Sequence, residues 1–309
     1  MPFDVTILGS NSALPAHGRH PTSQILNIAE ELFLIDCGEA TQIQFSRYKV
    51  RISRINNIFI SHLHGDHYFG LIGIITSYSL SGRKNALHVH GPAGLQDIIH
   101  TQLKYSGTSL GYELVFHAFE PENGKVIFSN EHMTVQSLEM KHRIPCSGFL
   151  FRETKAEKNI RKDKIAQYGL SIAQIVAAKQ GEDITLADGR IVPSSELLFP
   201  PHKPRSYAFC TDTLYNESLS EYIKEVDLLY HEATFDHSRL DRAIETFHST
   251  SLQAAAIAKM ANVKRMVIGH FSSRYREVEL EELLQETRSV FPHTDLALEG
   301  RTFGIERSF

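Results

Sequence analysis

Short apolar runs alternate with longer amphipathic stretches along the chain, and this alternation predicts a domain built from both strands and helices. In the first half, many of the short runs are rich in β-branched and aromatic residues and are bounded by turn formers, as strands are. The strands expected there span residues 3–8, 24–28, 32–35, 57–60, 87–90, 114–119, 125–129, 133–140 and 148–152. The stretches 40–48, 69–80 and 93–104 predict helices between them.

The second half repeats the order of strand followed by helix. Strands are expected at 207–210, 227–230 and 263–268, and helices at 251–261 and 278–289. The first of these helices has a start signal, because Thr250 and Gln253 form the pair of a capping box. Together the two halves predict a fold of the α+β class.

Residues 153–206 differ in composition from the segments on either side. Their first part holds the cations Lys155, Lys158, Arg161, Lys162 and Lys164. Two helical stretches and a turn at Asp188 follow, and the segment ends in prolines at 200, 201 and 204. It is too long to connect neighbouring strands, so we predict an arm inserted at 153–206 into a single domain that spans 1–309. A basic face on this arm suits phosphate binding, and the alternatives are a solvated helical lid or a dimerisation arm.

The overall composition is that of an ordinary globular protein. With 309 residues and 42% hydrophobic content, the chain can bury a large core. The net charge of −4 excludes a basic surface as a whole, so any nucleic-acid contact must use local basic patches. The first residues carry no leader pattern and no apolar run approaches a membrane span, so a cytoplasmic location without a membrane partner is expected. Cys37, Cys146 and Cys210 are too few and too scattered for a disulfide framework, which predicts free thiols.

The densest group of ionisable residues follows the strand expected at 57–60 and has the sequence His62-Leu-His64-Gly-Asp66-His67. In an extended chain His62 and His64 project to the same side, so two imidazoles can bind one ion. The intervening glycine lets the backbone turn tightly and brings Asp66 and His67 to a neighbouring position, which suits two metal ions. Imidazole and carboxylate ligands without thiolate are typical of catalytic zinc, with manganese or iron as alternatives. The simpler interpretation is a polar turn that happens to be rich in histidine.

This motif resembles the signature of the metallo-β-lactamase superfamily. The resemblance implies an αββα sandwich, in which two mixed sheets face each other, helices cover their outer faces, and a dinuclear metal site lies where strand ends converge. It also requires a later histidine, an aspartate and a last histidine, and His142, Asp212 and His270 occur in that order. The implied ligands are His62, His64 and His142 for one ion and Asp66, His67 and His270 for the other, with Asp212 as the bridge.

Two further motifs and the position of the arm narrow the resemblance. His231-Glu-Ala-Thr234, His248-Ser-Thr250 and an arm between His142 and Asp212 together resemble ribonuclease Z, the family of tRNA 3′-processing endonucleases. The resemblance covers essentially the whole chain. It implies a zinc-dependent endoribonuclease that cleaves the 3′ trailer from precursor tRNA, leaving a 3′-hydroxyl on the tRNA and a 5′-phosphate on the trailer. It also implies two zinc ions per chain, a homodimer, and the arm as the tRNA-binding exosite.

Three residues are candidates for the chemistry itself. The family assigns Asp66 a further part as base for the attacking water. His248 is the best candidate acid for the leaving 3′ oxygen, because an imidazole can be charged near neutral pH and a carboxylate partner, Glu232, favours that charge. The structural alternative for His248 is helix capping beside a core carboxylate.

Two other functions are compatible with the sequence. One is a small-molecule metallohydrolase, such as a lactonase, thioesterase or phosphodiesterase, which would leave the arm without a role. The other is a non-catalytic RNA-binding relative, which would have no need of all seven ligand positions. The loop 9–15 is either a simple connection or a loop near the metals whose amides, with Arg19, hold an anionic group. Asp36 is expected to orient a metal-binding histidine.

Overall fold

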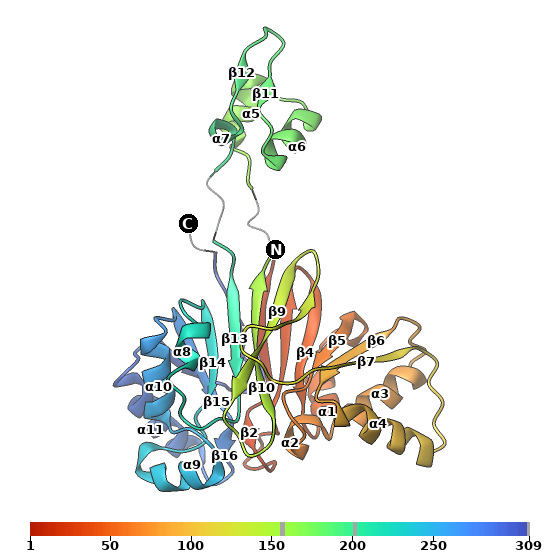
Figure 1. The fold of residues 1–309 in the computed structure, drawn as a ribbon, viewed down its shortest axis with the longest axis vertical. Coiled ribbons are helices and arrows are strands. Elements are labelled where there is room, and N and C mark those ends of the chain that lie inside the picture. The colour runs from red at the N-terminus through yellow and green to blue at the C-terminus, as the bar shows by residue number, and fades with distance from the viewer. Residues whose placement is uncertain (155–157, 200–202, 308–309) are drawn as a thin grey trace. The chain divides into compact units, whose positions relative to one another are not determined.

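The computed structural model describes residues 1–154, 158–199 and 203–307 (Figure 1). The chain divides into two compact units. The first consists of Met1–Arg152 and Ser206–Ile305, and the second of Glu153–Arg205 with the residues from Glu306 onward.

The first unit contains two seven-stranded sheets, each with parallel and antiparallel neighbours. The order in the first sheet is β18 (Thr302–Gly304), β1 (Phe3–Gly9), β3 (Ser23–Ile28), β4 (Glu31–Cys37), β5 (Ile55–Phe59), β6 (Leu87–Gly91) and β7 (Leu114–Ala118). The order in the second is β17 (Thr294–Leu296), β15 (Arg265–Gly269), β14 (Leu228–Glu232), β13 (Ser206–Cys210), β10 (Cys146–Glu153), β9 (Met133–Met140) and β8 (Val126–Ser129). Strands β4 to β7 are parallel in the first sheet, as are β13, β14, β15 and β17 in the second. Parallel strands end at the same edge of a sheet, and such edges are where α/β proteins place their sites.

The central core lies between the two sheets and is rich in aromatic rings. Phe59 of the first sheet contacts Phe149 and Phe151 of the second, with ring centroids 5.6 and 5.5 Å apart. Phe209 and Tyr230 continue this layer as a stacked pair. The apolar faces of the two sheets therefore cover each other, because alternate residues along each strand point into the same layer.

Helices cover the outer faces of both sheets (Figure 1). The first sheet packs against α1 (Thr41–Arg47), α3 (Leu71–Leu80) and α4 (Gly94–Tyr105), and the second against α8 (Leu219–Tyr222), α10 (Ser251–Met260) and α11 (Glu277–Arg288). The remaining helical segments of this unit are α2 (Gly65–Tyr68), α9 (Leu240–Thr246), η1 (Ile52–Arg54) and η2 (His237–Arg239). This αββα sandwich confirms the predicted fold class.

Observed and expected elements differ mainly at short segments. The helix expected at 69–80 is observed as α3, and α2 is an additional short helix just before it, separated from α3 by Phe69 and Gly70. A side chain at Gly70 would place its Cβ 2.2 Å from the carbonyl oxygen of Gly38, so the chain passes very close to the end of β4 at this point. The sequence did not predict β17, β18 or the parallel pair of β2 (Asn11–Ser12) with β16 (Phe271–Ser272), because segments of two or three residues show no measurable periodicity.

The second unit is built from short elements around a core of its own. Its elements are α5 (Lys162–Tyr168), α6 (Ile172–Gln180), the hairpin of β11 (Ile184–Thr185) with β12 (Ile191–Val192), and α7 (Ser194–Leu197). Leu170, Ala178, Ile184, Val192 and Leu197 are buried together. Ser171 and Gln174 form both hydrogen bonds of a capping box, which defines where α6 begins. The sequence predicts two helices and a hairpin here, the structure adds the short helix α7, and the role of the segment as an exosite stays a prediction.

The basic group expected on this unit is partly neutralised by neighbouring carboxylates. Arg161 pairs with Asp163 at 3.0 Å, and Lys164 pairs with Glu196 at 3.1 Å. Within the part of the chain that the structure describes, Lys158 and Lys162 make no ion pair. Lys155 lies outside the described residues, as do the residues at 200–202.

None of the helices in the described residues combines the length and the apolar composition that crossing a membrane requires. The three cysteines are buried free thiols, as the sequence predicts.

Candidate metal centre

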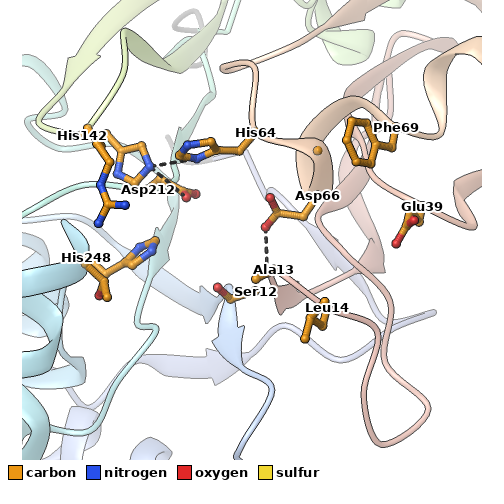
Figure 2. Close-up of a pocket in the computed structure, with 13 residues that line it drawn as sticks. Ser12, Ala13, Leu14, Glu39, His64, Asp66, Phe69, His142, Asp212 and His248 are labelled. Carbon is orange, nitrogen blue, oxygen red and sulfur yellow. Dashed lines mark hydrogen bonds and ion pairs between the residues drawn. The ribbon is translucent and has the colours of Figure 1, made fainter.

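The residues expected as metal ligands all follow the carboxyl ends of strands in the first unit. His62 and His64 lie in the loop after β5, and Asp66 and His67 lie in α2, which follows directly. His142 comes two residues after β9, Asp212 two residues after β13, and His270 directly after β15. The structure brings all seven side chains together, and Figure 2 shows His64, Asp66, His142 and Asp212 around one cavity. They form two groups, namely His62, His64, His142 with Asp212, and Asp66, His67 with His270.

Asp212 faces both groups. Its Oδ2 is 3.6 Å from Nε2 of His62 and 3.6 Å from Nε2 of His142. Its Oδ1 is 3.2 Å from Nε2 of His67 and 3.2 Å from Nε2 of His270. Ligand atoms around a tetrahedral ion with bonds of about 2.1 Å stand about 3.4 Å apart. Each oxygen of Asp212 therefore stands at ligand spacing from a different pair of histidines. This carboxylate is positioned to serve both ligand groups.

The remaining ligands complete the two groups at similar spacing. His64 Nδ1 is 3.0 Å from Nε2 of His62 and 3.2 Å from Nε2 of His142. Asp66 Oδ2 is 3.5 Å from Nε2 of His67 and 3.6 Å from Nε2 of His270. Nitrogen and oxygen atoms of different residues converge here on small volumes, which is how a protein binds cations.

Hydrogen bonds to the far sides of the rings determine which imidazole nitrogens are free. His142 Nδ1 is 3.0 Å from the carbonyl oxygen of Phe247, and since a carbonyl only accepts, this nitrogen carries the proton. His67 Nδ1 donates in the same way to Asp36 Oδ2 at 2.6 Å. Ser61 Oγ donates its proton to Asp36, so His62 Nδ1 is the donor in its 3.0 Å contact with Ser61 Oγ. Each of these rings therefore carries a proton on Nδ1 and turns Nε2 into the site, where Nε2 can bind a cation once the ring is neutral.

The fourth ring, His270, follows the same rule through the His231-Glu-Ala-Thr234 motif. Thr234 Oγ1 donates to Glu232 Oε2 at 2.6 Å, so its contact of 2.9 Å with His270 Nδ1 requires the proton to be on the histidine. His67 Nε2 and His270 Nε2 are buried and have no hydrogen-bond partner among the described residues. A buried nitrogen without a partner is costly unless it binds something. The donor set thus fits cations held by Nε2 of four histidines, Nδ1 of His64 and the carboxylates.

Opposite charges within the site shift its pKa values. Burial alone would raise the pKa of Asp212, but His270 and His67 hold that pKa well below its usual range. Burial would lower the pKa of His67, but Asp212 and Asp66 raise it well above the ordinary value. The carboxylates are therefore held ionised, and cations bound at the two groups would take over the role of the proton on His67.

Several residues at the site have a left-handed backbone that non-glycine residues rarely adopt. Their φ angles are 60° at Ala13, 53° at Asp36, 61° at Phe247 and 58° at His270. Ala13 uses this conformation to donate its backbone N–H to Asp66 Oδ2 at 2.8 Å. Phe247 uses it to present its carbonyl to His142. Such positions cost about 1–3 kcal/mol each and persist where the surrounding structure requires them.

His248 and Glu232 form a pair at the edge of the ligand cluster. His248 Nδ1 is 2.9 Å from Glu232 Oε1, and the fully buried carboxylate also accepts the backbone N–H of Thr213 at 2.9 Å. Burial lowers the pKa of His248, but Glu232 outweighs it and raises that pKa to about 9. The N-cap of α10 is Thr250 and not His248, whose backbone N–H instead bonds the Ala243 carbonyl at the end of α9. His248 lines the cavity in Figure 2.

The cavity over the cluster has a volume of about 470 Å³, which is the size of an ordinary ligand site. The segment between β1 and β3 forms part of its wall through Ser12 at the end of β2 and through Ala13 and Leu14 after it. Arg19 does not line the cavity, because its guanidinium donates to Asn11 Oδ1 and to the carbonyl oxygen of Tyr275. This arginine therefore fastens the loop instead of holding an anion. The Ala13 amide on Asp66 agrees with the expected alternative of a loop near the ligand cluster whose amides hold an anionic group, although turn formers do not indicate which N–H the loop presents.

Two facing sheets with this ligand cluster at the ends of their strands define a protein of the metallo-β-lactamase fold. The structure of human tRNase Z, short form, superimposes with a TM-score of 0.70 and 28% identity over 98% of this chain and 99% of that one. Ribonuclease Z of Phocaeicola vulgatus is 45% identical over 98% of both chains, and ribonuclease Z of Cytophaga hutchinsonii is 46% identical over 99% of this chain and 97% of the relative. A family model described as anti-Pycsar protein Apyc1 also matches residues 3–283. The chain belongs to the family that this model covers and, by its full-length relatives, to the ribonuclease Z family.

Proposed function

We propose that this chain is a metal-dependent endoribonuclease that cleaves the 3′ trailer from precursor tRNA, leaving a 3′-hydroxyl on the tRNA and a 5′-phosphate on the trailer. The observation that carries the proposal is 45% identity to a ribonuclease Z over 98% of both chains. The convergence of all seven ligand positions on one cavity supports it further. The identity to a ribonuclease Z favours this activity over a small-molecule hydrolase, and the complete ligand cluster argues against a non-catalytic relative, which would have no need of it.

The two ligand groups would hold two divalent cations, with Asp212 between them. Imidazole and carboxylate ligands suit zinc, and manganese or iron are the alternatives. Cations bound there would lower the pKa of a shared water toward neutrality and polarise the phosphodiester. Asp66 would help to hold one cation and orient or deprotonate the attacking water, and the Ala13 amide on its Oδ2 would fix the direction of that carboxylate.

His248 would supply the proton that the leaving 3′ oxygen needs. Its Nδ1 is bonded to Glu232, which leaves Nε2 as the atom that can donate to substrate. Glu232 favours the charged imidazole, and general acids of this kind contribute about 10²- to 10⁴-fold to rate. Cations bound nearby would lower the pKa of His248 toward neutrality, because like charges repel. Glu232 would therefore keep the acid protonated in the loaded enzyme.

Residues 153–206 would bind the substrate away from the reaction, where phosphate contacts determine position and not chemistry. Lys158 and Lys162 are the best candidates, because neighbouring carboxylates pair with Arg161 and Lys164. A homodimer would allow one chain to supply this arm to a tRNA that is cut by its partner. Three buried free thiols suit a reducing compartment, and we place the enzyme in the cytoplasm.

The direct test of the function is incubation of a transcribed precursor tRNA with the protein, followed by mapping of both new ends. We expect one cut near the last paired nucleotide of the acceptor stem, with a 3′-hydroxyl upstream and a 5′-phosphate downstream. Cleavage of a lactone panel without any cleavage of the precursor would overturn the proposal.

Deleting the arm should separate binding from chemistry. Arg152 and Ser206 are paired neighbours across β10 and β13, so a two-residue Asn-Gly turn can replace 153–205. We expect metal content and hydrolysis of bis(p-nitrophenyl) phosphate to be retained, and kcat/KM for precursor tRNA to fall about 100-fold through KM as phosphate contacts are lost.

A mixing experiment uses the same variant to test the dimer. Arm-deleted chains supply intact cleavage centres, and Asp212→Ala chains supply intact arms. If arms act in trans within a homodimer, the mixture should cleave precursor tRNA faster than either variant alone. Full activity of the arm-deleted chain by itself would remove the assigned role of the arm.

A further inference from the structure

Phe69 is an exposed apolar side chain at the mouth of a site otherwise rich in imidazoles and carboxylates. It is 55% exposed, although it lies only two residues after the ligand His67. Its ring lines the same cavity as His64 and Asp66 (Figure 2). An aromatic ring in this position offers a flat apolar surface next to the point of cleavage.

The ring is held in place by the turn that carries the ligands. A Cβ added to Gly65 would lie 2.2 Å from Cε2 and 2.4 Å from Cζ of Phe69, so the ring rests directly on the glycine backbone. Tyr68 contacts it edge-on, with ring centroids 5.1 Å apart. The backbone N–H of Phe69 donates to the Gly65 carbonyl at 2.9 Å. Because the ring of Phe69 is already fixed in this way, its side chain loses little entropy when a base stacks on it.

The charges around the cavity differ between its two sides. Figure 2 shows Phe69, Leu14 and Glu39 on the side of Asp66, and His142 and His248 on the opposite side. Arg143, the arginine that lines this cavity, contacts Phe247 and Glu245 near His248. Glu39 would repel a phosphate, whereas the apolar side chains of Phe69 and Leu14 suit a base. The side with Phe69 is therefore better suited to a nucleobase than to the RNA backbone.

The chemistry determines which base this is. Cleavage breaks the bond between phosphorus and the 3′ oxygen, and His248 gives its proton to that oxygen, which stays with the last nucleotide of the tRNA. The phosphate stays with the first nucleotide of the trailer. The tRNA end then lies on the side of His248, and the trailer continues across the cavity toward Phe69.

We infer that Phe69 stacks on the base of the first trailer nucleotide and so holds the scissile phosphate over the ligand cluster. The inference rests on the proposed function and on the role of His248. Every base has a π-face, so stacking on this ring tolerates any sequence at the first trailer position. Phe69 is thus a substrate-positioning residue that binds the first trailer base without distinguishing which base it is.

The test is a double-mutant cycle between the ring and the base. Wild type, Phe69→Ala and Phe69→Tyr are compared on three precursors, namely an unmodified one, one that is abasic at the first trailer nucleotide, and one that is abasic at the last tRNA nucleotide. Leu80→Ala is the matched control, because Leu80 is 88% exposed and does not line the cavity. Stacking on an aromatic ring is worth about 10- to 100-fold in binding, so Phe69→Ala should lower kcat/KM on the unmodified precursor by that factor. Phe69→Tyr and Leu80→Ala should stay near wild type.

The abasic precursors give the decisive comparison. On the precursor without the first trailer base, Phe69→Ala should equal wild type, which also shows that the turn and its ligands are intact in the variant. The inference would be overturned if Phe69→Ala lowered kcat/KM on that precursor as much as on the unmodified one, or if the effect of the substitution disappeared only when the last tRNA base was missing. Either result would leave the proposed function standing. Failure of wild type to cleave the unmodified precursor would overturn both.

Discussion

Asp212→Ala is expected to lower kcat/KM for precursor tRNA by at least about 10⁴-fold, because one carboxylate serves both ligand groups. Its two oxygens face Nε2 atoms of four different histidines. Without it, the group of His62, His64 and His142 has no carboxylate, and the other group keeps only that of Asp66, which is too little negative charge for a pair of close cations. Metal content measured by elemental analysis should fall together with activity.

The matched control for this variant is Asp241→Ala. Asp241 is an exposed carboxylate in the first turn of α9 and does not belong to the cluster. Its replacement should leave both activity and metal content near wild type. A folded Asp212→Ala protein that keeps the wild-type rate would contradict the bridging assignment.

His248→Ala is expected to lower kcat by about 10²- to 10⁴-fold and to leave the metal content unchanged. This residue is bonded to Glu232 and belongs to neither of the two groups that the seven expected ligands form, although it also lies beside Asp212 and His270. The decrease in kcat should arise only because the leaving 3′ oxygen no longer receives a proton. A precursor with sulfur in place of that oxygen has a leaving group that departs without a proton, so the variant should approach the wild-type rate on it.

His100→Ala is the control for the loss of an imidazole, since His100 is exposed on α4. If His248→Ala lost the same factor on the oxygen and the sulfur precursors, the histidine would not be the acid. Loss of metal in His248→Ala would instead assign it to the binding of the cations.

The local part of the site could be predicted from the sequence. His62, His64, Asp66 and His67 lie within six residues, so strand geometry and one glycine are enough to expect that they act together. His142, Asp212 and His270 are far apart in the chain, and only the family resemblance connected them. The sandwich brings them together because each follows the end of a strand.

The backbone contributions could not be predicted. The Ala13 amide on Asp66 and the Phe247 carbonyl on His142 depend on left-handed φ angles, which side-chain identity does not reveal for alanine or phenylalanine. The ion pairs within the arm could not be predicted for a similar reason. Counting cations in the sequence says nothing of the carboxylates that fold against Arg161 and Lys164.

The most direct measurement is precursor cleavage by protein stripped of metal and titrated with zinc. The seven ligands form two groups that share Asp212, so activity should be absent at the start, rise with added zinc and level off at two ions per chain. Undiminished cleavage by the metal-free chain would contradict the account, because the cluster would then have no part in breaking the RNA.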